Sequence, residues 1–148
     1  MKRIDVATKK WTKLVNTFPW FREYVVLEGG KKIWKSREFY YPLVGMGWYK
    51  LIWDMCTKIK AVYDKNPERY EMYNVTDIKE KYGGLRYYTT CSPEEFEEYV
   101  REAEGLSYKT CEKCGKPGKT VEIYSWFSTL CKKHENARRK NHKKRFGW

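Results

Sequence analysis

The stretch that decides the fold runs from Cys111 to His134 and reads CEKCGKPGKTVEIYSWFSTLCKKH. It contains two cysteines spaced C-x2-C, sixteen intervening residues, and then a C-x2-H pair. Three thiolates and one imidazole, arranged in two such pairs, are typical ligands of tetrahedral Zn²⁺. We therefore expect Cys111, Cys114, Cys131 and His134 to hold a structural Zn²⁺, because four protein ligands leave the metal no open position for chemistry.

The residues between and after the two ligand pairs predict a small finger. Gly115 allows a tight turn after the second cysteine, and residues 121–124 and 126–127 are suited to the short strands of a hairpin. The second ligand pair would then lie on the first turn of a C-terminal helix. A knuckle, a hairpin and a helix in this order describe a treble-clef-like zinc finger over residues 108–148.

A redox-active pair is the alternative interpretation of the first two cysteines. A thioredoxin-like pair opens a helix, whereas a glycine loop follows this one. The remaining cysteines, Cys56 and Cys91, are expected to be free thiols, as is usual in a reducing compartment. The basic N-terminus leads into no apolar segment of the kind found in secretory signals, and no apolar run is long enough to cross a membrane. We therefore expect a cytoplasmic protein.

The composition predicts a packed domain in front of the finger. The chain has 148 residues, of which 41% are hydrophobic and 18% aromatic, including seven Trp and thirteen Tyr. Disordered chains lack so much large apolar surface, and none of the biases of collagen, coiled coils or low-complexity segments is present. Because the mean hydropathy is only −0.86, the core must rely on aromatic side chains. An α+β domain is expected over residues 1–107.

Periodicity and turn residues divide this domain into helices and hairpins. The clearest helix covers about 46–64, where apolar residues follow a 4-3-4-3 spacing that begins at Trp48. A helix after Ser92 is expected to open with a capping box that includes Glu95. The other expected elements are a helix over 5–17, strands at 23–28 and 31–41 around a Gly-Gly turn, and a hairpin over 73–90.

The hairpin over 73–90 presents a candidate binding face. Its two central glycines, 83–84, are expected to occupy the turn, which pairs Lys81 with Arg86. Because side chains alternate along strands, one face would carry three cations and a ring, namely Lys79, Lys81, Arg86 and Tyr88. This face suits a small nucleotide, and an ordinary solvated face is the alternative. Glu80 lies on the opposite face among apolar side chains, so we expect it to bond an internal cation or hydroxyl.

Positive charge is concentrated near the C-terminus. The chain has 31 Lys and Arg against 19 Asp and Glu, a net charge of +12. Residues 108–148 hold twelve basic and only three acidic residues. The segment after His134 has almost no apolar face, so we expect either a frayed tail or an element ordered on a polyanion. The cations expected to contact phosphates are Lys132, Lys133, Arg138, Arg139, Lys140, Lys143, Lys144 and Arg145.

Catalysis is not expected. If His134 ligates zinc, His142 is the remaining imidazole, and no dinucleotide fingerprint, phosphate loop or nucleophile elbow is present. An HNH-like nuclease is the remaining enzymatic alternative. Such nucleases keep a histidine on the hairpin strand before the metal helix, and residues 121–127 contain none.

Three segments in this order resemble small phage and prophage proteins of uncharacterised function. They are VTDIKEKYGGLRYY (75–88), CEKCGKPG (111–118) and WFSTLCKKH (126–134). The resemblance covers roughly residues 45–135 and implies a phage-encoded accessory product that acts in the cytoplasm of an infected bacterial host. Host takeover and antagonism of host defence are the roles that such an origin implies, and no activity is carried over with it.

The expected function is therefore binding without catalysis. The leading hypothesis is a zinc-stabilised protein that binds an anionic ligand, either DNA, RNA or a small nucleotide. The alternative is a protein–protein inhibitor of a bacterial host enzyme, anchored by exposed Trp and Tyr side chains.

Overall fold

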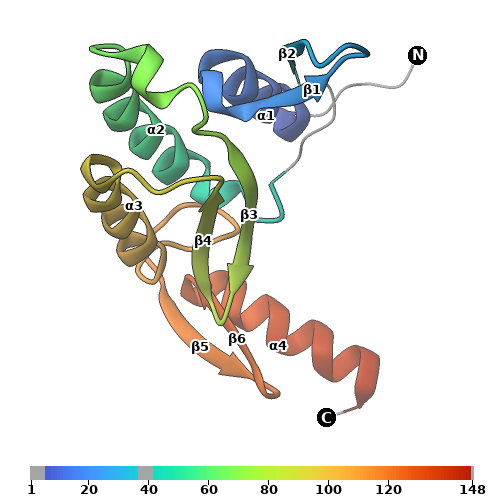
Figure 1. The fold of residues 1–148 in the computed structure, drawn as a ribbon. Helices are drawn as coiled ribbons and strands as arrows, with labels where there is room; N and C mark the ends of the chain where they lie inside the picture. Colours follow the sequence, from blue (N-terminus) through green and yellow to red (C-terminus); the bar gives the residue numbers. More distant parts are fainter. Residues whose placement is uncertain (1–5, 37–41, 148) are drawn as a thin grey trace.

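Helices and short antiparallel hairpins alternate along the chain (Figure 1). The computed structural model describes residues 6–36 and 42–147. Its elements are α1 (Val6–Thr17), β1 (Arg22–Val26), β2 (Lys32–Ser36), α2 (Tyr49–Tyr63), β3 (Val75–Lys81), β4 (Gly84–Thr89), α3 (Glu94–Ser107), β5 (Lys119–Ile123), β6 (Trp126–Leu130) and α4 (Lys132–Phe146). Short 3-10 helices lie at Pro19–Phe21, Met46–Trp48 and Pro67–Tyr70. The predicted α+β class is confirmed, with β1–β2, β3–β4 and β5–β6 as three two-stranded sheets.

We call residues 6–36 and 42–107 the body and residues 108–147 the cysteine module. Of the predicted extended segment 31–41, residues 32–36 form a strand and 37–41 lie outside the described residues. No helix in the described part of the chain has both the length and the apolar character needed to cross a membrane.

The core of the body is aromatic, as the composition predicts. Phe18, Trp20, Phe96 and Trp48 are almost completely buried between α1, α2, α3 and the β3–β4 hairpin. Phe18 and Trp20 stack with ring centroids 5.4 Å apart, and Phe96 contacts the rings of Tyr70 and Tyr73. The predicted 4-3-4-3 spacing is confirmed, because Trp48, Ile52, Met55 and Ile59 are buried and Val62 is partly buried beside them.

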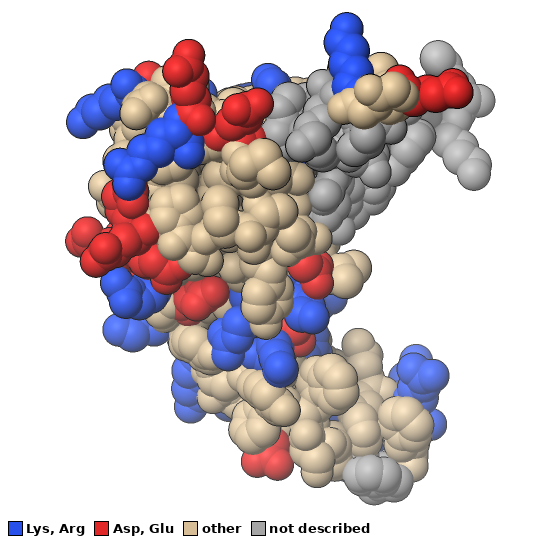
Figure 2. Space-filling view, viewed as in Figure 1, with Lys and Arg blue, Asp and Glu red and all other residues tan. Residues whose placement is uncertain are grey.

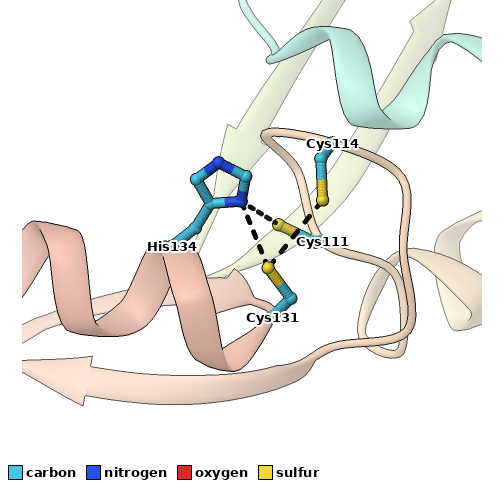
Figure 3. A group of neighbouring side chains, drawn as sticks. All are labelled: Cys111, Cys114, Cys131 and His134. Carbon is cyan, nitrogen blue, oxygen red and sulfur yellow. Dashed lines mark hydrogen bonds between the residues drawn. The ribbon is translucent and has the colours of Figure 1, made fainter.

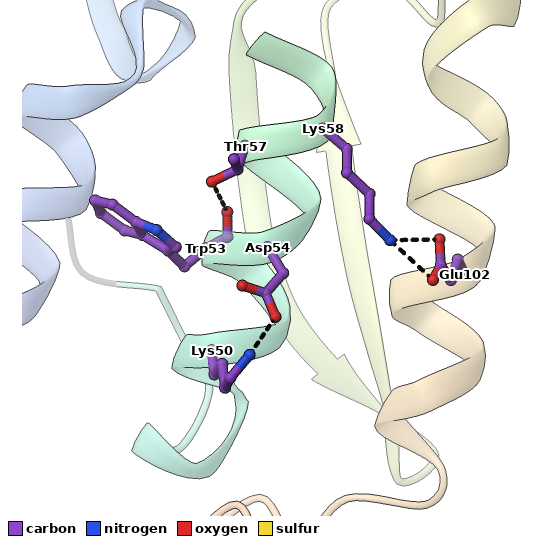
Figure 4. A network of polar contacts seen from close by, with 6 residues as sticks. All are labelled: Lys50, Trp53, Asp54, Thr57, Lys58 and Glu102. Carbon is purple, nitrogen blue, oxygen red and sulfur yellow. Dashed lines mark hydrogen bonds and ion pairs between the residues drawn. The ribbon is translucent and has the colours of Figure 1, made fainter. Parts of the chain in front are cut away.

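Ion pairs line the solvent edge of the helical layer (Figure 4). Lys58 on α2 contacts both carboxylate oxygens of Glu102 on α3, at 2.9 and 3.0 Å. Lys50 contacts Asp54 one turn along α2 at 2.6 Å. All four side chains are close to half exposed or more, so both pairs add little stability, and of the two the Lys58–Glu102 pair bridges α2 and α3.

The register of the β3–β4 hairpin differs from the predicted one. Lys81 pairs with Gly84 rather than with Arg86, because Tyr82 and Gly83 form the turn. Both turn residues have positive φ, 53° and 86°, as a type I′ turn requires. The prediction that two glycines supply these angles was wrong, since a tyrosine occupies the first position.

Gly84 is small for a different reason. A Cβ atom there would lie 2.2 Å from Cζ of Tyr108, which follows α3. From Asp77 to the turn, the register change moves each residue two positions along its partner strand, so these side chains keep their predicted faces. In this register Lys79, which was predicted opposite Tyr88, lies opposite Arg86 across the outer face of the hairpin.

The predicted capping box of α3 was wrong. The helix begins at Glu94, after Pro93, and no side chain caps it. The Glu95 carboxylate instead accepts a hydrogen bond from Tyr70 Oη at 2.7 Å and pairs with Arg69 at 2.8 Å. This partnership ties the start of α3 to the 3-10 helix before β3.

Candidate metal centre

Four ligand-type side chains converge at one end of the cysteine module (Figure 3). Cys111 and Cys114 come from the loop after α3, while Cys131 and His134 come from the start of α4. The three thiol sulfurs and one imidazole nitrogen lie within 4.8 Å of one another. The sequence prediction of these four residues as one cluster agrees with this arrangement.

The distances within the cluster suit a tetrahedral metal ion. Cys114 Sγ lies 3.8 Å from Cys131 Sγ, and His134 Nδ1 lies 3.5 Å from Cys111 Sγ and 3.2 Å from Cys131 Sγ. Zn–S bonds of about 2.3 Å and Zn–N bonds of about 2.0–2.1 Å at tetrahedral angles separate sulfurs by about 3.8 Å, and sulfur from nitrogen by about 3.5 Å. The residues present therefore fit a metal of this size.

Local backbone geometry places the first ligand pair. Gly115 has φ +79°, and its N–H donates to the carbonyl of Cys111 at 2.9 Å, which closes the loop between the two cysteines. The Cys111 N–H in turn donates to the carbonyl of Lys116 at 2.8 Å. Glycine is needed after the second cysteine because other residues rarely adopt this angle.

The start of α4 places the second pair. Cys131 occupies the N-cap position, with extended backbone angles, and its carbonyl accepts the first helical hydrogen bond from Glu135 N at 2.9 Å. Two residues three positions apart then lie on one side of the first turn. This is the arrangement predicted from the C-x2-H spacing.

The electrostatic surroundings favour the thiolate form of the buried ligand. Burial opposes ionisation of Cys111, but backbone N–H groups of Cys131, Cys114 and Lys113 outweigh it and lower the pKa of Cys111 to about 6. A thiolate, not a thiol, binds a metal. The loop therefore prepares this sulfur for coordination near neutral pH.

The cysteine module has a very small apolar core. Its buried apolar residues are Cys111, Ile123 and Leu130, with Val121 and Cys131 partly buried beside them. So little apolar surface does not hold a module of this size by itself. A metal bond between the loop and α4 would supply the missing stabilisation.

The module is also fastened to the body. Gly47 N donates to the carbonyl of Glu112 at 2.7 Å, and Gly45 N donates to the Glu112 carboxylate at 2.9 Å. The indole of Trp48 donates to the carbonyl of Thr110 at 2.9 Å. On the other side, Thr129 Oγ1 donates to the carbonyl of Gly83 at 2.6 Å. The first three contacts join the loop of residues 110–118, which we call the metal loop, to the start of α2. The fourth joins β6 to the β3–β4 turn.

The structure places the predicted basic residues of the C-terminal segment on α4, which packs on β5 and β6. The helix is held beyond its first turn, contrary to the expectation of a tail without tertiary support. Arg138 donates to Ser128 on β6, and His142 stacks on Tyr124 with ring centroids 3.6 Å apart. Sequence reasoning missed this support because it looked for apolar residues rather than a histidine ring.

The cations predicted to contact phosphates differ in whether another group of the protein already engages them. Lys132 and Arg139 contact the carboxylate of Glu135, at 3.8 and 3.0 Å, and Arg138 is taken up by its contact with β6. In the described part of the chain, no ion pair involves the exposed cations Lys133, Lys140, Lys143, Lys144 and Arg145.

The predicted cations of the hairpin lie together on the outer face of β3 and β4. Lys79 Nζ lies 5.3 Å above the Tyr88 ring and 3.6 Å from Asp77. Lys81 lies toward the turn on the same face, and Arg86 lies opposite Lys79. Figure 2 shows basic side chains over this hairpin and, below them, a mostly uncharged surface with one acidic patch at its lower edge. Among the residues that the structure describes, no cation or hydroxyl of the predicted kind bonds Glu80, and its carboxylate instead accepts the Gly83 N–H at 2.7 Å.

A cavity that sequence analysis did not predict lies between the two hairpin turns. Its volume is about 340 Å³, and its lining residues are Glu80, Lys81, Tyr82, Ser125, Trp126 and Phe127. The adjacent aromatic residues Trp126 and Phe127 could have indicated the cavity, but they were assigned to a strand without regard to their exposure.

No protein-family model, curated protein or solved structure matches this chain significantly.

Proposed function

We propose that this chain is a zinc-stabilised, non-catalytic nucleic-acid-binding protein whose principal contact surface is the exposed side of α4. The cysteine module is then a treble-clef-like finger with a basic C-terminal helix. The carrying observation is that α4, an anchored helix, holds a group of exposed cations that form no ion pair with any residue the structure describes. The phage accessory role that the resemblance implies is part of the same proposal.

The metal in this proposal is one structural Zn²⁺. Three sulfur ligands and one imidazole favour zinc over the harder cations, which prefer oxygen. The four ligands close the coordination sphere, so the metal's part is to fasten the loop to α4 and not to polarise a substrate.

The distribution of charge on α4 supports a phosphate contact. Glu135 is the single acidic residue on this helix, and it is already engaged by Lys132 and Arg139. The next two turns carry Lys140 and Lys143 among other cations, with no acid to neutralise them. Cations fixed on a helix lose little freedom when they meet a phosphate backbone, which favours binding over a mobile tail.

The geometry of His142 gives little support to the nuclease alternative. Its ring stacks on Tyr124 with centroids 3.6 Å apart and contacts the tilted ring of Phe146 at 4.6 Å. It follows His134 by eight residues on one helix, which separates their backbones by about 12 Å. A base at this distance would not reach a water molecule on the metal.

The test measures binding of a fluorescein-labelled 20-base-pair duplex by anisotropy over a series of salt concentrations. A triple variant replaces Lys140, Lys143 and Lys144 with Ala, and we expect weaker binding and a salt dependence reduced by about one phosphate contact per lysine.

The matched control removes the same number of charges at the opposite end of the molecule, by replacing Lys9, Lys31 and Lys65 with Ala. These side chains are exposed and lie on or beside the elements farthest from α4 in Figure 1. Equal loss of binding in both variants would mean that net charge alone attracts the duplex, and α4 would not be the contact surface.

A further inference from the structure

The turns of the β3–β4 and β5–β6 hairpins expose three large rings around one cavity. Tyr82 is 67% exposed, Trp126 65% and Phe127 42%. All three line the cavity of about 340 Å³ described above. Rings left in solvent around a hollow mark a binding site more often than isolated exposed residues do.

Backbone strain is concentrated at the same place. In the described part of the chain, the residues other than glycine with positive φ are Tyr82, Tyr124 and Ser125. They form the two turns that meet at the cavity. Positive φ is costly for a bulky residue such as tyrosine, so a smaller turn residue would be more stable here unless the ring had a use.

The polar groups of the cavity suit a nucleobase and its phosphate. Lys81 supplies a cation, and its ammonium lies 5.8 Å above the Tyr82 ring. Glu80 supplies a carboxylate, of which the Gly83 N–H occupies one acceptor position on Oε1. The acceptor capacity that is left can bond an exocyclic amino group such as that of cytosine.

The cavity continues the basic face of the β3–β4 hairpin. Lys79 and Arg86 lie opposite each other on that face, and Lys81 follows toward the turn. A phosphodiester strand that follows these cations would bring a base to the rings at the end of the hairpin. Rings that stack on successive bases, beside a basic track, are the usual means of binding single strands.

We infer that this cavity seats one unpaired nucleobase of a single-stranded nucleic acid, with a preference for a base that carries an exocyclic amino group. The inference rests on the proposed function and names the form of nucleic acid that the β3–β4 side of the protein takes. The rings stack on the base, Lys81 contacts the adjoining phosphate and Glu80 accepts from the amino group.

The test uses the metal-loaded full chain and labelled (dC)12, with (dT)12 and the 20-base-pair duplex for comparison. Trp126→Ala is expected to weaken (dC)12 binding about 5- to 150-fold, the range for loss of one stacked base. Duplex binding should change less than about twofold. Tyr82→Asn removes the ring but keeps a residue that tolerates positive φ, so its loss of (dC)12 binding does not depend on misfolding.

The control Met72→Ala shortens an exposed apolar side chain that does not line the cavity. It should leave (dC)12 binding unchanged. Glu80→Gln keeps an acceptor for the Gly83 N–H and adds donors, so it should reduce the preference for (dC)12 over (dT)12.

Three outcomes separate this inference from the proposed function. If both ring variants bind (dC)12 as the unmodified protein does, the base site is wrong while the α4 surface stands. If the α4 triple variant leaves duplex binding unchanged, the proposed function is wrong. If (dC)12 gives Trp126 no protection from acrylamide quenching, the rings do not hold a base, and a protein partner becomes the better assignment.

The same assay distinguishes the source of the base. Binding of cytidine monophosphate as tightly as (dC)12 would assign a free nucleotide. Tighter binding of (dC)12 or of (rC)12 would assign a DNA or RNA strand, respectively, and both results retain the stacked base.

Discussion

Replacement of Gly47 by Ala tests how the metal loop is joined to the body. A Cβ atom at this position would lie 2.0 Å from the carbonyl oxygen of Cys111 and 2.6 Å from that of Glu112. Both are backbone atoms, so no side chain can move aside. Overpacking of this kind costs about 1–3 kcal/mol, and loss of the Gly47 N–H bond to Glu112 adds about 0.5–1.5 kcal/mol. We expect a loss of about 1.5–4.5 kcal/mol in the free energy of unfolding.

The assay is equilibrium unfolding in urea of metal-loaded protein, followed by tryptophan fluorescence and circular dichroism. Gly105→Ala is the matched control, because a Cβ atom there meets no atom within 4 Å. Gly105 lies within α3, so its replacement should stabilise the protein by up to about 1 kcal/mol. A Gly47→Ala protein within about 0.5 kcal/mol of the unmodified one would refute the close approach on which this reasoning depends.

Three further predictions concern thiols, pH and an ion pair. In metal-loaded native protein, Ellman's reagent should react with Cys91 alone. After a chelator is added, the three thiols of the cluster should react as well. Cys56 should react only after unfolding, because burial raises its pKa and shields it from the reagent. Burial also raises the pKa of Glu104 in the folded protein above its value in the unfolded chain, so the stability of the protein falls as pH rises through the folded-state pKa. Glu104→Gln should therefore be more stable than the unmodified protein at pH 7. Below the ordinary carboxyl pKa of about 4.3, the urea midpoints should show no advantage of the variant over the unmodified protein. Lys58→Met breaks the half-exposed pair with Glu102 and should shift the free energy of unfolding by less than about 1 kcal/mol in the same urea assay, a larger loss being evidence against a solvent-screened pair.

The parts of the fold that were predicted correctly depend on neighbours close in the sequence. The clustering of Cys111, Cys114, Cys131 and His134 follows from two short spacings, and the buried stripe of α2 follows from its helical period. Both patterns depend on spacings within one short segment, and both are found in the structure.

The parts that were missed depend on residues far apart in the sequence. The turn rule assigned both glycines to positive φ, but the Tyr108 ring requires Gly84 to be small inside the strand. The capping rule assigned the Glu95 carboxylate to a backbone N–H at the start of α3, whereas in the structure it accepts a hydrogen bond from Tyr70 Oη. The cavity at Trp126 exists because two hairpins meet, which no local pattern describes.

The bonds between the start of α2 and the metal loop also affect the order of events on the ribosome. Trp48 and Gly45 find their partners 62 and 67 residues later in the chain. At about 5–20 residues per second, synthesis of such a length takes roughly 3 to 13 s. During that interval the Gly45 N–H and the Trp48 indole N–H lack their acceptors, because the loop that carries them has not yet been translated. The supply of metal to the nascent chain would therefore determine when the first half of the protein completes its own fold.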